Sequence, residues 1–134
     1  MIMEWLWAGL LVLAATQASS RALALLLALK WAANYAAFFL IAQTAPALID
    51  IGLGTVGVIW ASRRHALWSD AVIAGFVLVP LVHGWYWLQY PGGAVSEVAY
   101  YRLLVALFTL QTAAVAWPAA LRAARTLHRR RSTA

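Results

Sequence analysis

Long apolar runs separated by short polar breaks dominate the sequence. A helix needs about 20 mainly apolar residues to cross about 30 Å of hydrocarbon. Five runs of roughly that length cover approximately residues 2–18, 21–43, 46–62, 67–89 and 97–121. The pattern therefore predicts an all-α fold, a polytopic membrane protein with a compact bundle of transmembrane helices over residues 1–121. A basic cytoplasmic tail follows over residues 122–134.

The breaks between the runs carry residues that begin and end helices. Ser20 precedes the second run, where its hydroxyl can cap the free N–H groups of a helix start. Thr44 and Pro46 hold the same place before the third run, and proline is tolerated in a first turn. The segment 90–93, with the letters YPGG, predicts a turn, and Ser96 predicts the start of the fifth helix. Because all the breaks are short, neighbouring helices must run antiparallel.

Composition excludes several classes of protein. The 134 residues are 65% hydrophobic and 10% charged, whereas soluble domains are about half apolar and about a quarter charged. A chain this small could not bury so much apolar surface in water. The composition excludes a soluble globular enzyme and a disordered tail. The absence of cysteine excludes disulfides, thiolate metal sites and a cysteine nucleophile.

The basic residues predict how the chain lies in the membrane. Ten Lys and Arg stand against four Asp and Glu, giving a formal charge of +6. Eight of the ten occupy the first and third breaks and the tail, at Arg21, Arg63, Arg64 and five arginines within residues 122–131. The positive-inside rule makes these regions cytoplasmic. Five spans in a bacterial inner (plasma) membrane then place the N-terminus outside and the C-terminus in the cytoplasm.

The first run has a second interpretation as a secretory signal peptide. Residues 16–18, Thr-Gln-Ala, form a tolerable small-residue cleavage site, and cleavage there would leave four spans. Against this, Glu4 is the only charge before the apolar run, where a signal peptide carries Lys or Arg. We therefore expect the first span to be retained.

Asp50 is a charge inside the third run. An ionisable residue within a span is kept when it is paired, faces protein or lines water. Asp50 shares one helical face with the small residues Gly54, Gly57 and Ala61. Small residues let helix backbones approach closely, so this face is expected to pack against another helix.

Arg102 lies on a similar face of the fifth run. It shares that face with Ala106 and Ala113, so the arginine is also expected to point at protein. Asp50 and Arg102 lie about one turn in from the same boundary. We therefore predict an ion pair between Asp50 and Arg102 that joins the third and fifth spans.

Lys30 and Asn34 lie one turn apart near the middle of the second run. Asp70 lies about five residues, or ~7 Å, away in depth, within the reach of a lysine. Three roles are therefore open for Lys30: it pairs with Asp70, it extends to the inner interface, or it lines water as a functional group. Asp70 has a further interpretation in the first turn of a helix, where the helix dipole favours a carboxylate.

His83 is the one histidine within a run. It can serve as a hydrogen-bonding strut between helices, as a proton relay, or as one axial ligand of a haem shared across a dimer. No second histidine lies at a comparable depth, and no pair of ligands stands at helical spacing. We therefore expect neither a metal ion nor a cofactor.

The sequence shows no combination of nucleophile, base and carboxylates that would indicate catalysis, so a non-enzymatic role is predicted. The first hypothesis is a self-associating protein or an accessory subunit of a larger membrane complex. The second is a small oligomeric channel or transporter whose polar path includes Lys30, Asn34, Asp50, His83 and Arg102. The expected partners are the lipid bilayer, further copies or subunits, and anionic lipid at the basic tail; nucleic acid is not expected.

A third hypothesis comes from a compositional resemblance. The very small size, the polytopic apolar body, two closely spaced starts in the letters MIM at residues 1–3, and the short basic tail are similar to phage holins. The resemblance implies a lysis protein.

Overall fold

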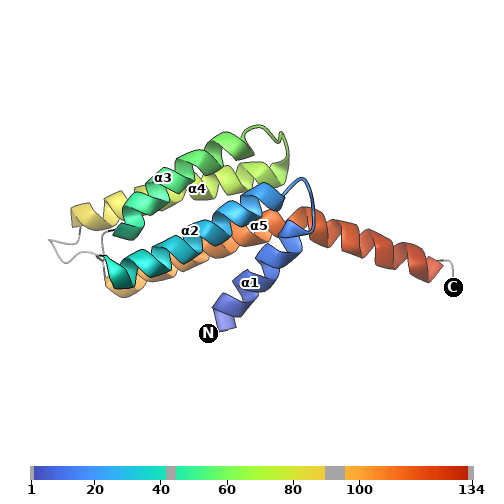
Figure 1. Cartoon of the computed structure of the whole chain (residues 1–134), viewed down its shortest axis with the longest axis horizontal. Coiled ribbons are helices and arrows are strands. Elements are labelled where there is room, and N and C mark those ends of the chain that lie inside the picture. The colour runs from blue at the N-terminus through green and yellow to red at the C-terminus, as the bar shows by residue number, and fades with distance from the viewer. Residues whose placement is uncertain (1, 42–44, 90–95, 133–134) are drawn as a thin grey trace.

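The computed structural model describes residues 2–41, 45–89 and 96–132 (Figure 1). These residues form an all-α bundle with no strand, which confirms the predicted fold class. The helices are α1 (Ile2–Ala15), α2 (Arg21–Leu40), α3 (Ala45–Ala61), α4 (Leu67–Gln89) and α5 (Glu97–Ser132). The predicted turn at 90–93 and Thr44 lie outside the described residues.

The helix boundaries differ most from prediction at the two ends of the chain. α1 ends at Ala15, before the Thr-Gln-Ala segment, and the basic tail continues α5 as one helix to Ser132. Ser96 begins α5 as predicted, since its hydroxyl accepts a hydrogen bond from the N–H of Ala99 at 3.1 Å. Ser20 precedes α2 but does not cap it: its hydroxyl donates to the carbonyl of Ala14 at 2.8 Å and so ties the end of α1 to the start of α2.

The bundle is built from antiparallel neighbours. α3 packs against α2 and α4, α4 packs against α5, and α1 crosses obliquely against α5 and α2. The α1–α2 and α3–α4 connections lie at the end of the bundle from which α5 extends (Figure 1). Three helices, α2, α4 and α5, are long and apolar enough to cross a membrane; α1 with 14 residues and α3 with 17 are shorter.

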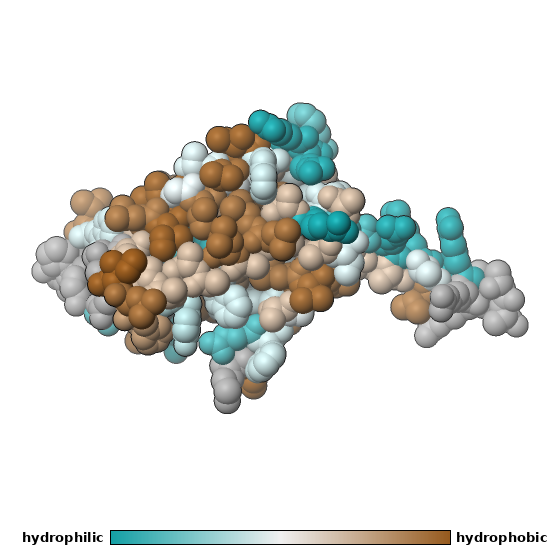
Figure 2. Space-filling model, viewed as in Figure 1, coloured by the Kyte–Doolittle hydropathy of each residue, from teal (hydrophilic) through white to brown (hydrophobic). Residues whose placement is uncertain are grey.

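The surface of the bundle is largely apolar. Figure 2 shows hydrophobic residues across the body of the molecule, with hydrophilic ones gathered over the α3–α4 connection and along the extension of α5. Large side chains such as Leu40, Leu67 and Leu88 are more than four-fifths exposed. A surface of this kind is suited to a lipid surrounding rather than to water.

Close packing of α3 on α4 depends on the small-residue face of α3. Gly54, Gly57 and Ala61 are buried, as the sequence predicts. Pro80 has no N–H, so the Phe76 carbonyl lacks its usual helical donor. This carbonyl would lie 3.5 Å from a Cβ placed at Gly54, and the Phe76 ring fills the space beside Gly57.

The prediction of which face of α5 is buried is wrong. Arg102, Ala106 and Ala113 are exposed, and the packed face instead carries Leu107 and Gln111 with residues further along the helix. The reason is the place of α5 between α1 and α4. There the face that carries Leu107, Gln111, Ala116 and Ala119 is turned inwards, and the face that carries Arg102 is turned outwards.

Replacing Gly57 by alanine is expected to lower the free energy of unfolding by about 1–3 kcal/mol. The added methyl group would overlap the ring of Phe76, which is itself almost fully buried. Gly52→Ala is the matched control, since position 52 is exposed with no neighbour within 4 Å. Thermal unfolding in detergent, followed by circular dichroism, measures both. Equal stability of the two variants would contradict the packing.

Candidate functional site

The carboxylate of Asp50 is the centre of a buried polar cluster. One of its oxygens, Oδ1, lies 3.0 Å from Lys30 Nζ and accepts a hydrogen bond from Asn34 Nδ2 at 2.5 Å. The other oxygen, Oδ2, lies 2.8 Å from His83 Nε2. Lys30, Asp50 and His83 are each less than 5% exposed. The cluster therefore binds α2, α3 and α4 together through one carboxylate.

The helix pairing explains why these residues meet. Lys30 and Asn34 are one turn apart on α2, so both point to the same side. Asp50 lies in the second turn of α3, at the end of the bundle where α2 finishes. The lysine lies deeper than the aspartate, and its long side chain covers the difference. The glycines that follow Asp50 let α3 lie close enough for the short carboxylate to reach its partners.

His83 extends the cluster to the fifth helix. Its Nδ1 lies 2.5 Å from the hydroxyl of Tyr100, and the Tyr100 ring stacks on Tyr86 at 4.0 Å between centroids. In the neutral ring one nitrogen donates and the other accepts. When Nε2–H donates to Asp50, the Tyr100 hydroxyl therefore donates to Nδ1. The arrangement is a continuous hydrogen-bonded chain from Tyr100 through His83 to Asp50.

The ammonium group of Lys30 is held between aromatic rings as well as by its carboxylate partner. Nζ lies 5.9 Å from the centroid of Phe76 and 5.8 Å from that of Phe108. Ring faces attract cations at this range, more strongly where water is excluded. The two rings therefore stabilise the charge deep in the bundle.

A cleft of about 810 Å³ opens beside the cluster. Pro46 and Glu97 line it at the helix ends, and Lys30 and Phe108 line it at mid-bundle. Its remaining walls are mainly aromatic. The Oδ1 atom of Asn34 is buried and has no hydrogen-bond partner among the described residues. This oxygen is therefore an unsatisfied acceptor beside the charged groups.

Beyond Lys30 the bundle is closed by apolar side chains. Leu27, Val72 and Phe76 are almost fully buried there, together with Val115 from α5. The charged groups thus reach the middle of the bundle from one end, and beyond them the core also holds the uncharged side chains of Gln111 and Thr112. Among the described residues, no buried charged group lies beyond Lys30.

The predicted Asp50–Arg102 ion pair is wrong, and so is the Lys30–Asp70 pair, one of three alternatives for Lys30. Asp50 pairs with Lys30 and contacts His83, while Arg102 is exposed on the outer face of α5. Lys30 does not pair with Asp70, which is exposed in the first turn of α4. Similar depth suggested the Asp50–Arg102 pair, but the rotation of α5 turns the arginine outwards.

Tyr100 is the member of the cluster that the sequence did not indicate. It belongs to a group of aromatic residues near a helix end, which is typical of an interfacial belt. The signal that could have identified it is its depth: it lies in the first turn of α5, at the level where His83 approaches the end of α4. Among residues 2–41, 45–89 and 96–132, no three His, Asp or Glu side chains group as a metal site.

No family model, curated protein or solved structure matches the chain. The function must therefore be argued from the cluster and the cleft.

Lys30→Met and Asp50→Asn are each expected to lower the free energy of unfolding by about 3–5 kcal/mol. Each change leaves the other buried charge without its counter-ion. The double variant removes both charges and is expected to recover most of that loss. Denaturant unfolding in mixed micelles measures all three.

Arg64→Gln is the matched control for this cycle, because it also removes one positive charge but at an exposed position. Its effect should stay within about 0.5 kcal/mol. A double variant that loses the sum of the two single losses would disprove the Lys30–Asp50 pair. An Arg64→Gln variant as unstable as Lys30→Met would also contradict the pair, since the loss would then not depend on burial of the charge.

Proposed function

We propose that the protein is a small non-enzymatic membrane protein that carries protons, or ions coupled to protons, along a path centred on Asp50. The observation that carries this proposal is the hydrogen-bonded chain Tyr100–His83–Asp50, which ends on Lys30 and lies against an open cleft. Chains of carboxylate, imidazole and hydroxyl groups within spans serve as proton relays.

The proposed transfer uses the two nitrogens of His83. Tyr100 passes its hydroxyl proton to Nδ1 and takes another from water in the cleft, which makes the ring of His83 an imidazolium. Loss of the Nε2 proton to Asp50 Oδ2 then returns the ring to its neutral form in the other tautomer. Protonation cancels the charge of Asp50 and leaves the Lys30 ammonium without its counter-ion. That imbalance favours onward release of a proton or a change in helix packing.

An oligomer is the proposed working form. The path in one bundle ends at the apolar core, so passage across the membrane requires a rearranged bundle or a second copy. The exposed Arg102 and Ala106 on α5 support the second possibility. An arginine facing lipid is unfavourable, and small residues beside it permit close helix contact. The same exposed face supports a second candidate function, a self-associating accessory subunit of a membrane complex.

All five helices are proposed to cross a bacterial inner membrane. The end of the bundle with Arg21 and the Arg63–Arg64 pair is proposed to face the cytoplasm, following the positive-inside rule. The cleft would then open on the outer side. α1 is about 21 Å long at 1.5 Å per residue, so local thinning of the bilayer has to accommodate it.

The topology predicts that Ile2→Cys and Ser132→Cys are labelled from opposite sides. The chain has no cysteine of its own, so each variant carries a single thiol. A membrane-impermeant maleimide applied to intact spheroplasts is expected to modify position 2, and position 132 only after lysis. Labelling of both positions in intact spheroplasts would contradict the five-span arrangement.

Proteoliposomes loaded with a pH-sensitive dye test the proposed function. Asp50→Asn and His83→Gln are each expected to reduce proton flux by about 100-fold, the effect typical of removing a proton-transfer group. Asp70→Asn is the matched control, an exposed carboxylate at the opposite end of the bundle that should leave flux unchanged.

Each variant is first checked for intact assembly by size-exclusion chromatography. Wild-type flux that persists in Asp50→Asn would refute the relay. Wild-type vesicles no leakier than empty ones, together with co-purification in a larger complex, would favour the accessory subunit instead.

A further inference from the structure

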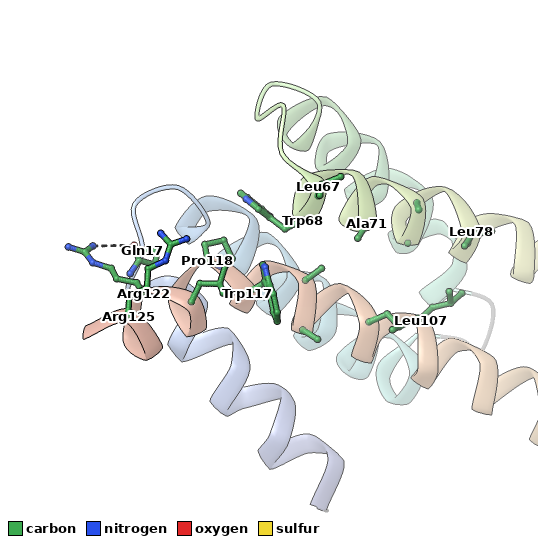
Figure 3. A pocket seen from close by; sticks show the side chains of 16 residues that line it. Gln17, Leu67, Trp68, Ala71, Leu78, Leu107, Trp117, Pro118, Arg122 and Arg125 are labelled. Carbon is green, nitrogen blue, oxygen red and sulfur yellow. Dashed lines mark hydrogen bonds between the residues drawn. The ribbon is translucent and has the colours of Figure 1, made fainter. Parts of the chain in front are cut away.

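A second hollow lies between α4 and α5, away from the charge cluster. It has a volume of about 1010 Å³, and Figure 3 shows it as a groove between the two helices. Small residues on both helices create it, among them Ala71 and Ala74 on α4 and Ala113 on α5. Leucine side chains from the two helices complete an almost wholly apolar wall.

One end of this groove is basic. Arg122 and Arg125 lie there beside Gln17, and Arg122 Nη1 donates to Gln17 Oε1 at 3.3 Å (Figure 3). Within the described part of the chain, neither arginine pairs with an acidic side chain. Both are exposed. The guanidinium groups therefore remain able to bind an anion at the mouth of an apolar groove.

The groove is long enough to hold a lipid chain. Its wall on α5 extends from Leu107 to Leu121, which is about 21 Å at 1.5 Å per residue. One leaflet contributes about half of the ~30 Å hydrocarbon thickness. Trp68 and Trp117 lie near the basic end, where indole rings are suited to the boundary between hydrocarbon and headgroups.

We propose that this groove binds an anionic phospholipid of the bilayer, with one acyl chain between α4 and α5 and its phosphate on Arg122 and Arg125. The lipid is the occupant that matches both parts of the site at once. A soluble anion would leave the apolar walls exposed, and a second copy of this chain would bring further positive charge to the arginines, since each chain carries a formal charge of +6. The site is independent of the proton path.

Native mass spectrometry from nanodiscs tests the headgroup contact. The discs contain equal amounts of phosphatidylglycerol and phosphatidylcholine with identical acyl chains. Wild-type protein is expected to retain phosphatidylglycerol preferentially, and Arg122→Gln/Arg125→Gln to retain it about 30-fold less, as expected for the loss of two charges facing phosphate.

Arg63→Gln/Arg64→Gln is the matched control, because it removes the same charge at the same end of the bundle but outside the groove. This control should retain phosphatidylglycerol as the wild type does. Equal retention of the two lipids by wild-type protein would overturn the proposal. Equal losses in the two double variants would also overturn it, since they would indicate a diffuse attraction to the charged surface.

Filling the groove tests the acyl chain separately. Ala74→Phe places a ring in the groove and is expected to abolish lipid retention, whereas Ala32→Phe, at an exposed position on α2, should not. Retention by Ala74→Phe would show that the arginines bind phosphate without the groove, and would overturn the proposal. Disulfide formation between two Ala74→Cys chains in bilayers would overturn it too, because a second copy would then occupy the groove.

Discussion

The carboxylate of Asp50, buried and shared among three helices, is the interaction on which the bundle depends. Apolar helices in lipid have little hydrophobic reason to choose one neighbour over another. A buried charge supplies that choice, because an unpaired carboxylate or ammonium there is strongly unfavourable. Lys30 from α2 and His83 from α4 both contact Asp50. The pairing therefore fixes which helices meet and at what depth.

Much of the fold could be predicted because apolar length and helix-starting residues act locally. The predicted and observed bounds of α4 agree, and the buried face of α3 follows from its glycines. The rotation of α5 could not be predicted, since small residues occur on more than one of its faces. Which face packs depends on α1 and α4, and hence on contacts far apart in the sequence.

The partners of Asp50 could not be predicted from the sequence, for a related reason. Depth along a helix is readable from the sequence, and it suggested Arg102 as the partner. A long lysine side chain reaches a carboxylate at a different depth, so similarity of depth favoured the wrong residue. In the sequence, Tyr100 belongs to a group of aromatic residues near a helix end, as is typical of an interfacial belt. Its contact with His83 exists only because α4 and α5 lie side by side.

The apolar closure beyond Lys30 makes the bundle electrically asymmetric. In a bilayer, water entering the cleft would carry the outer potential inwards as far as the charge cluster. Most of the voltage would then fall across the short apolar layer around Phe76, where moving one elementary charge involves about 2.3 kcal/mol per 100 mV. Movement of an ion within the cleft would be nearly insensitive to voltage, whereas any passage beyond Lys30 would depend on it steeply.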